Sequence, residues 1–241
     1  MMETCRLLKE SLCEARFVVA LSGAGLSTAA GIPDFRGKEG VYAKGLYDPY
    51  KTFDIGYFRQ DPSHFFRFAK EFFSVYDKIR PTRGHLFLSA LEREGKLKGV
   101  ITQNIDGLHQ LAGSQKVTEI HGSFFKGHCL ACGREYPFQW MRETLREREE
   151  LRCECGGVVK PDIVFFGEAV EGLSEAEDLA RRADLFLVMG SSLTVQPAGF
   201  LPRLCSGKVV ILNQGDVNFP QERTFLRFDQ PIDRVVESRA Y

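Results

Sequence analysis

The stretch FVVALSGAGLSTAAG, residues 17–31, joins a short apolar run directly to a turn of glycines and other small residues. The run from Phe17 to Leu21 is typical of a strand that is buried on both faces of a parallel sheet. The turn after it lets backbone N–H groups approach a pyrophosphate at the start of a helix. The match to a dinucleotide-binding fingerprint is partial, because Thr28 stands at the third glycine position. At this point a tight glycine turn without a ligand is the alternative interpretation.

Similar apolar runs recur along the chain, and helical patterns lie between several of them. The runs are at 97–102, 162–166, 185–189 and 209–212, and the helical patterns are at 3–15, 62–78, 84–94 and 174–182. Strands that alternate with helices predict an α/β fold with a doubly wound parallel sheet, in which ligands bind at the carboxyl ends of the strands. Small or polar residues follow two of the runs and give further hints of a nucleotide site. These residues are Gly190, Ser191, Ser192 and Asn213.

The composition is that of an ordinary globular protein and disfavours some partners. The chain has 241 residues, of which 44% are hydrophobic and 27% charged, and 32 basic residues balance 32 acidic ones. This balance argues against broad electrostatic binding to nucleic acid or to an anionic membrane. The sequence shows no signal peptide and no apolar stretch approaching the ~20 residues of a membrane helix. We therefore expect a cytoplasmic protein.

Four of the seven cysteines crowd into two short-spaced pairs, Cys129-x-x-Cys132 and Cys153-x-Cys155. Thiolate pairs close to glycines suit a tetrahedral Zn²⁺ ion. Four sulfurs close the coordination sphere and leave no position for water or substrate, so we expect one structural zinc ion. The alternatives are His128 as a substitute ligand and four buried thiols without metal.

The cysteine pairs lie in a segment that breaks the alternation of strands and helices. We interpret residues 124–160 as a small inserted zinc-binding module, and residues 1–123 with 161–241 as the large domain. A further helical insert near 38–80 is possible. A zinc ribbon that binds nucleic acid is the rival use of such a module, but bases and acids nearly balance within it.

Several short motifs occur in a fixed order between residues 17 and 213. They are GAGLS at 23–27, GIPDFRG at 31–37, TQNIDGLH at 102–109, HGS at 121–123, the two cysteine pairs, FGE at 166–168 and GSS at 190–192. In this order they resemble the sirtuins, the NAD-dependent protein-lysine deacylases. The resemblance implies a Rossmann-like large domain and a small zinc domain, with NAD and an acyl-lysine peptide meeting in the cleft between them. The compact length suggests a prokaryotic-type member.

The resemblance also implies roles for individual residues. Those implied to contact NAD are Gly23, Ala24, Gly25, Ser27, Asp34, Phe35, Arg36, Gln103, Asn104, Ile105, Asp106, Gly190, Ser191, Ser192 and Asn213. Those implied to pair with the peptide and enclose the lysine tail are Val164, Phe165, Phe166 and Gly167. The zinc ligands would be the four clustered cysteines.

The implied chemistry explains why these residue types are needed. The acyl carbonyl oxygen attacks the ribose C1′ of NAD as nicotinamide leaves, and the products are lysine and 2′-O-acetyl-ADP-ribose. Asn104 and Asp106 would hold nicotinamide and ribose in a reactive pose. His121, after a predicted strand at 117–120, would be the base that deprotonates a ribose hydroxyl, because an imidazole pKa lies near neutrality.

Other histidines and the aromatic residues have structural interpretations. We expect His64 at the surface, His85 to open a helix and cap or pack locally, and His109 to orient the turn rather than to react. The phenylalanines at 65, 66, 68, 72 and 73 fit a helix packed against its neighbours, and the alternative is an acyl pocket.

Two departures and three alternatives remain. The second cysteine pair is one residue tighter than is usual in the family. Family members that prefer succinyl-lysine carry a Tyr-x-x-Arg pair where this chain has Ala69 and Phe72, so an acetyl or a longer apolar acyl group is expected. An ADP-ribosyltransferase, a dehydrogenase and a non-catalytic zinc and nucleotide module are the other candidate functions.

Overall fold

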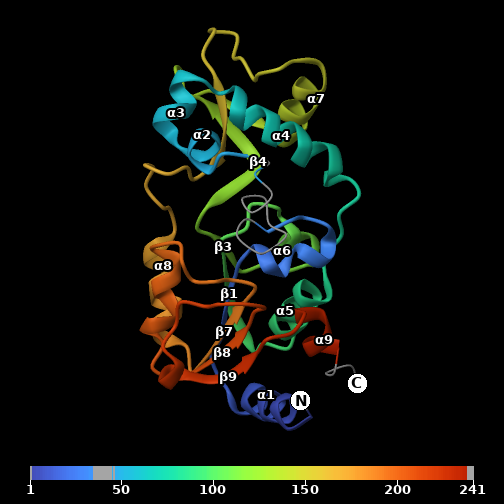
Figure 1. Ribbon diagram of the computed structural model, residues 1–241, viewed down its shortest axis with the longest axis vertical. Coiled ribbons are helices and arrows are strands. Elements are labelled where there is room, and N and C mark those ends of the chain that lie inside the picture. Colours follow the sequence, from blue (N-terminus) through green and yellow to red (C-terminus); the bar gives the residue numbers. More distant parts are fainter. Residues whose placement is uncertain (1, 35–44, 46, 238–241) are drawn as a thin grey trace.

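The computed structural model of the chain describes residues 2–34, 45 and 47–237, and these residues form two lobes stacked along the long axis (Figure 1). The sheet lobe, at the bottom of that view, is built on a six-stranded parallel sheet with helices around it. The aromatic lobe, at the top, is built on three antiparallel strands and four helices that share a phenylalanine-rich core.

The strands of the sheet lobe follow the order β3-β2-β1-β7-β8-β9, and all neighbours are parallel. The strands are β1 Val18–Ser22, β2 Leu97–Thr102, β3 Val117–Glu119, β7 Leu185–Met189, β8 Lys208–Leu212 and β9 Thr224–Phe228. The order reverses between β1 and β7, which is the doubly wound, Rossmann-like arrangement. The predicted fold class is confirmed. In the register of these two strands Ser22 lies beside Met189, so the loops that follow leave the sheet side by side.

Helices cover both faces of this sheet. The helices α1 Met2–Glu14, α5 Arg83–Arg93 and α9 Ile232–Glu237 share one core cluster with alternate strand residues such as Val18 and Ala20. On the other face, α8 Leu173–Arg182 and the 3₁₀ helix η3 Ala198–Leu204 share a cluster with Val19 and Leu21. Side chains of period two thus bury β1 on both faces, as its continuous apolar run predicts.

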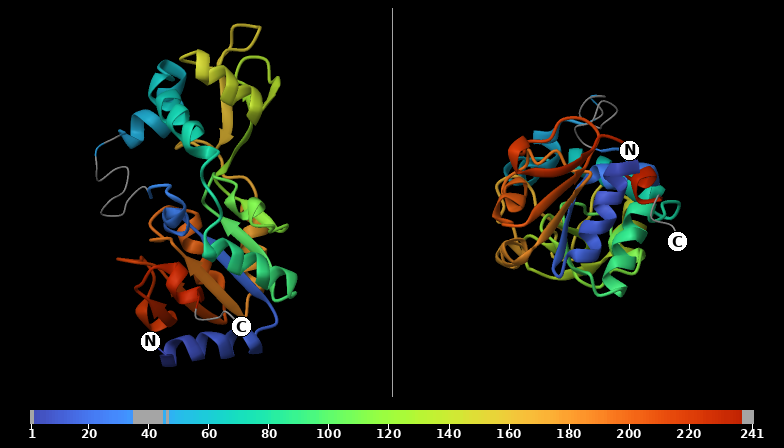
Figure 2. Two further views of the ribbon diagram at one scale, coloured as in Figure 1. Left: turned by 90° about the vertical axis from the view of Figure 1, so that its right-hand side faces the viewer. Right: turned by 90° about the horizontal axis from the view of Figure 1, so that it is seen from below.

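The aromatic lobe has a sheet of the order β5-β4-β6, with β4 Gly122–Cys129, β5 Glu135–Pro137 and β6 Val159–Ile163. Its helices are α2 Pro49–Phe53, α3 Ile55–Gln60, α4 Ser63–Tyr76 and α7 Phe138–Glu147 (Figure 2, left). Phe65, Phe66 and Phe73 of α4 are almost fully buried, and the Phe72 ring stacks on Phe124 with centroids 4.6 Å apart. Core packing is therefore the confirmed interpretation of the phenylalanine cluster.

One predicted strand is wrong. Residues 162–166 do not join the parallel sheet; β6 ends at Ile163 and pairs antiparallel with β4. The run is apolar because Ile163 and Phe165 insert into the aromatic core rather than between two helix layers. Pro161 fits this position, because an edge strand can accommodate a residue without an N–H donor.

The remaining short elements are α6 Leu108–Leu111 and the 3₁₀ helices η1 Ala24–Leu26, η2 Thr28–Ala30 and η4 Gln221–Arg223. The helices predicted at 3–15, 62–78, 84–94 and 174–182 are confirmed as α1, α4, α5 and α8, within one or two residues at each end. Within the described ranges, every helix is too short or too polar to cross a bilayer.

Candidate active site

Two glycine-rich loops interlock at the carboxyl edge of the sheet, one after β1 and one after β7. The Gly25 N–H donates to Gly190 O over 2.9 Å, and the Gly23 N–H donates to Met189 O over 3.0 Å. A Cβ on Gly25 would stand 2.9 Å from the Gly190 Cα, and Gly190 itself has φ 68°, so both positions require glycine. The junction lies where the strand order reverses, which is where open α/β sheets bind their ligands.

Buried side chains tie the turn after β2 to the first of these loops. Asn104 Nδ2 donates to Gly23 O and to Ser27 Oγ, each over 3.1 Å, and Ser27 Oγ donates to Asp106 Oδ2 over 2.7 Å. Burial raises the pKa of the Asp106 carboxyl, and hydrogen bonds from the Leu108 N–H and the Ser27 hydroxyl oppose this rise. The loop and the turn therefore form one hydrogen-bonded unit.

His121 stands between β3 and β4, where the chain passes from the sheet lobe to the aromatic lobe. Its Nδ1 lies 3.1 Å from the carbonyl oxygen of Gln103. Because a carbonyl only accepts, Nδ1 carries the proton and Nε2 is the basic nitrogen of the neutral ring. The Gln103 side chain in turn donates to Ser191 Oγ over 2.8 Å. The imidazole is thus oriented by the turn that also carries Asn104 and Asp106.

A pocket opens against the interlocked loops and combines residues that are distant in the sequence. Four of the predicted cofactor residues line it, namely Gly25, Asp34, Gly190 and Asn213. Residues that the sequence analysis missed also line it, among them Thr28, Gln214, Gln230 and Asp233. Gln214 is the second residue after β8, next to Asn213, and could have been found from its position at a strand end. Gln230 and Asp233 follow β9, whose alternating residues were not predicted as a strand.

Some predicted cofactor residues lie outside this pocket. Ile105 packs against the aromatic core, and the Ser192 hydroxyl lies 3.0 Å from that of Thr194. Ala24 begins η1. Phe35 and Arg36 fall outside the described residues.

A buried chain of polar groups supports the turn after β2. His109 Nε2 lies 2.8 Å from Ser22 Oγ, which donates to Thr102 Oγ1 over 2.7 Å. Thr102 Oγ1 also accepts the Asn104 N–H over 3.0 Å. His109 therefore orients the turn, as expected from the sequence.

His85 and His109 are both buried, with ring centroids 4.8 Å apart. Burial lowers the pKa of His85 to about 3 and that of His109 to about 4, so both rings are neutral at pH 7. His85 Nδ1 accepts the Thr82 N–H over 3.2 Å and completes a capping box at the start of α5. The expectation that His85 opens and caps a helix is confirmed. His64 lies half-buried near the start of α4, 3.9 Å from Asp61.

The four clustered cysteines converge at the far end of the aromatic lobe. Their sulfurs all lie within 4.8 Å of one another, with Cys129 Sγ 3.5 Å from Cys155 Sγ and Cys132 Sγ 3.6 Å from Cys153 Sγ. Four sulfurs about 2.3 Å from one zinc ion are about 3.8 Å apart, so the cluster fits a tetrahedral site despite the tight second pair. His128 points elsewhere, with Nδ1 2.6 Å from Asp162 Oδ1.

Residues 164–167 run between the lobes beside His121. The Val164 N–H donates to His121 O over 2.9 Å. The Phe166 N–H donates to Phe53 O over 2.7 Å, and Phe166 O accepts the Ile55 N–H over 3.1 Å. The Phe165 ring is buried in the aromatic core, whereas Phe166 is 45% exposed. The segment thus links the α2–α3 junction to the histidine and presents one ring outward.

The model of a family described as the Sir2 family matches residues 23–197 of the chain. An NAD-dependent protein deacetylase of Sulfurisphaera tokodaii is 44% identical over 214 residues, which are 87% of this chain and 84% of the relative. A protein of Thermotoga maritima with the same name is 43% identical over 227 residues, 92% of this chain and 91% of the relative.

Solved structures of similar proteins have the same fold. A Sir2 complex with a p53 peptide and NAD⁺ has a TM-score of 0.88 and 38% identity, and covers 97% of this chain and 95% of its own. A complex of a Sir2 mutant with a deacetylated p53 peptide and 3′-O-acetyl ADP-ribose has a TM-score of 0.90 and 39% identity, with coverage of 96% and 95%.

Proposed function

The chain belongs to the Sir2 family, and on that premise we propose that NAD and an acyl-lysine peptide meet between the interlocked loops, His121 and residues 164–167. The protein is an NAD-dependent protein-lysine deacetylase. NAD, acetyl-lysine and water give nicotinamide, lysine and 2′-O-acetyl-ADP-ribose, because the acyl carbonyl oxygen attacks the ribose C1′ and the acyl group then moves to the ribose.

The loops bind NAD along the carboxyl edge of the sheet. NAD supplies a C1′ that becomes electrophilic as nicotinamide departs. Gly25 and Gly190 leave backbone N–H groups accessible to the pyrophosphate, and Asn213, after β8, hydrogen-bonds a ribose hydroxyl. The other residues assigned to the cofactor are Gly23, Ala24, Ser27, Asp34, Phe35, Arg36, Gln103, Ile105, Ser191 and Ser192.

Asn104 and Asp106 orient the nicotinamide and its ribose. Both side chains are almost completely buried and are held by Ser27, so they do not reorganise when the substrate binds. Holding the leaving group and the C1′ centre in one geometry lowers the entropic part of the barrier.

His121 is the general base. The Gln103 carbonyl fixes the proton on Nδ1, so that Nε2 accepts the proton of a ribose hydroxyl. The proton moves to Nε2, and the hydroxyl oxygen then attacks the acyl carbon. The proximity of Val164 to the His121 backbone supports this role, because it sets the peptide-binding segment beside the base.

The aromatic lobe carries the peptide-binding segment and the zinc site. Val164, Phe165, Phe166 and Gly167 pair with the peptide and enclose the lysine tail. The four cysteines would hold zinc beside the end of β4 and the start of β6, where it would supply structure and take no part in the reaction. We assign residues 124–160 to the zinc module, residues 38–80 to a helical insert and the remainder of the chain to the NAD-binding domain. The core that α4 shares with α7 and β4 supports an insert whose described helices pack on the module.

A cytoplasmic location fits the cysteines. All seven are free of disulfides, and four of them form a cluster of free cysteines that a reducing compartment preserves.

The hydrogen bond between His121 Nδ1 and Gln103 O carries the proposal, because it joins the base to the turn that orients the nicotinamide. The purified protein should release nicotinamide only when both NAD and an acetyl-lysine peptide are present. With NAD labelled in its adenine ring, an ADP-ribosyltransferase would instead leave the label on the target protein. A dehydrogenase would produce reduced cofactor. Either result, or no release of nicotinamide with a range of acyl-peptides, would refute the proposal.

A further inference from the structure

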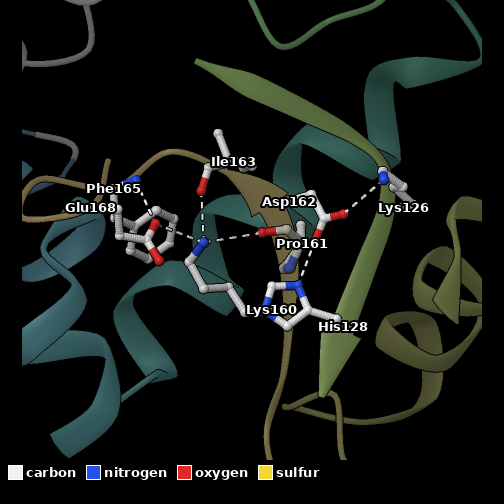
Figure 3. A network of polar contacts seen from close by, with 8 residues as sticks. All are labelled: Lys126, His128, Lys160, Pro161, Asp162, Ile163, Phe165 and Glu168. Atoms are coloured by element: carbon white, nitrogen blue, oxygen red, sulfur yellow. Dashed lines mark hydrogen bonds and ion pairs between the residues drawn. The ribbon is translucent and has the colours of Figure 1, made fainter. Parts of the chain in front are cut away.

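A lysine of β6 is buried inside the aromatic lobe, directly beneath the peptide-binding segment. Lys160 is only 2% exposed, and its ammonium uses all three donors. Nζ lies 2.6 Å from Ile163 O, 3.3 Å from Pro161 O and 2.9 Å from Glu168 Oε2, and 4.4 Å from the centre of the Phe165 ring (Figure 3).

The Glu168 carboxylate contacts both Lys160 and the backbone of the turn at 163–168. Glu168 Oε2 accepts the Phe165 N–H over 2.8 Å as well as the Lys160 ammonium, and the Glu168 N–H donates to Phe165 O over 3.0 Å. The backbone from Ile163 to Glu168 is therefore folded around one buried positive charge, and Figure 3 shows the contacts that Ile163, Phe165 and Glu168 make in this network.

Stability alone does not account for this arrangement. The Lys160 ammonium is withdrawn from water, whereas the Glu168 side chain is 27% exposed, so the desolvation of the ammonium offsets much of the attraction between the two charges and an uncharged pair at such a site is often equally stable. Removing one partner, by contrast, strands the other charge. What an ion pair of fixed geometry supplies is a defined backbone conformation for the groups that it contacts.

The other side of the same segment is fixed by the backbone. The backbone of Val164 is hydrogen-bonded to that of His121, and the backbone of Phe166 is hydrogen-bonded to those of Phe53 and Ile55. Residues 164–167 are thus held by these backbone hydrogen bonds on one side and by the Lys160–Glu168 ion pair on the other. The backbone conformation of the segment depends on both sets of contacts.

We propose that Lys160 and Glu168 are positioning residues for the acyl-lysine substrate: the ion pair between the buried Lys160 ammonium and the part-exposed Glu168 carboxylate sets the backbone of residues 164–167 in the conformation that receives the peptide. The inference rests on the proposed role of this segment. Neither residue contacts the reacting atoms, so their effect falls on peptide binding and leaves NAD binding and the chemical step unchanged.

Two variants separate positioning from folding. Lys160→Met leaves Glu168 without its partner and should lower the melting temperature. The double variant Lys160→Met with Glu168→Gln removes both charges and keeps an acceptor for the Phe165 N–H, so its melting temperature should return to near the wild-type value. In both variants the KM for an acetyl-lysine peptide should rise about tenfold, with kcat and the KM for NAD within about twofold of wild type.

Lys126→Met is the matched control. Lys126 belongs to the neighbouring strand and pairs with Asp162 over 3.6 Å, but its side chain is 65% exposed, so neither stability nor the peptide KM should change. Lys160→Arg keeps the positive charge and should regain most of the peptide affinity.

Peptide affinity is also measured directly, by fluorescence anisotropy of a labelled acetyl-lysine peptide. If the wild type binds the peptide but turns over no NAD, the proposed activity fails while the affinities of the variants still decide the inference. A double variant that binds the peptide as tightly as wild type overturns it. So does a loss confined to kcat and melting temperature, which would mark the ion pair as structural only.

Discussion

The sheet lobe and the aromatic lobe are each stabilised by a different kind of core. The sheet lobe has aliphatic clusters on both faces of six paired strands, and its loops are tied to one another by buried hydrogen bonds. The aromatic lobe has three strands, a core of phenylalanine rings and a cluster of four cysteine sulfurs. The sheet lobe buries its apolar side chains between its own sheet and helices. The aromatic lobe has too little sheet to do so, and its stability depends on ring packing and a metal.

We assign the reaction to the junction between the sheet lobe and the aromatic lobe. His121 lies between the last strand residue of one lobe and the first of the other, bonded to Gln103 on one side and to Val164 on the other. We therefore expect the groups assigned to NAD to keep their geometry without a metal, and those assigned to the peptide to depend on zinc.

Metal removal should have the largest effect and should act on one lobe. Cys129→Ala, or complete chelation, should unfold β4 and β6 while β1 and β7 stay protected, because metal binding contributes about 10 kcal/mol or more to the folding of such sites. Amide hydrogen exchange checks this strand by strand. Cys205→Ala is the control: this buried cysteine of the sheet lobe donates to Ala183 O, and its loss should cost about 1 kcal/mol without releasing zinc. Wild-type protection of β4 after zinc is removed would contradict the difference between the lobes.

His121→Ala should abolish deacetylation and leave both lobes folded. Losing a general base costs about 10²–10⁴-fold in rate, or about 3–5 kcal/mol, whereas the ring is only half-buried, so its truncation should cost little stability. The measurements are kcat/KM for an acetyl-lysine peptide and the thermal unfolding curve. His64→Ala, on α4, should match wild type in both. Retained turnover by the His121 variant would remove this residue from the mechanism.

The lack of a cation at positions 69 and 72 should decide which acyl group is accepted. Ala69 and Phe72, where succinyl-specific relatives of the family carry a tyrosine and an arginine, are both buried in the ring cluster. In an acyl site without that arginine, a succinyl carboxylate would lose its hydration without gaining a cation. We expect kcat/KM for a succinyl-lysine peptide to be about 100-fold below that for the acetyl peptide. Equal values for the two peptides would show that a cation reaches the acyl site.

Acid should weaken the sheet lobe through its two buried histidines. Their pKa values are lowered to about 3 and about 4, so the folded state stays neutral while the unfolded chain takes up protons below its ordinary value of about 6.5. The stabilisation is present above that value and is lost as the pH falls toward about 4 and below, at about 1.4 kcal/mol per pH unit for each histidine. Urea unfolding at pH 7.0, 5.5 and 4.5 measures the slope. His109→Gln should reduce the slope of the unfolding free energy against pH by the contribution of one proton. An unchanged slope would contradict the prediction that His85 and His109 are both neutral in the folded protein.

The sheet lobe could be predicted from the sequence in more detail than the aromatic lobe. Continuous apolar runs such as 18–22 and 185–189 have only one simple explanation, a strand covered on both faces, and the glycine turns after them mark the ligand edge. In the aromatic lobe the same kind of run, at 162–166, is apolar for another reason: Phe165 packs among rings that come from α4, about 100 residues earlier in the chain. No local pattern carries that information.

The candidate site follows the same division. Asn104, Asp106 and His121 could be named because their motifs are contiguous, and Gln214 could have been added as the neighbour of Asn213. The Lys160–Glu168 pair could not, because a lysine in a strand is ordinarily solvated and its burial depends on how the turn at 163–168 folds back over it. Asp233 is a similar case, since α9 brings it to the pocket only through packing against α5.

The attack of the acyl oxygen on the ribose is tested most directly by isotope transfer. A peptide whose acetyl-lysine carries ¹⁸O in the carbonyl is incubated with NAD and the purified protein, and the products are analysed by mass spectrometry. The bond from that oxygen to C1′ should persist, so the label should appear in the ADP-ribose part of O-acetyl-ADP-ribose, with one nicotinamide released per lysine freed. Label recovered in free acetate, with NAD intact, would show that water cleaves the amide directly and would contradict the proposed mechanism.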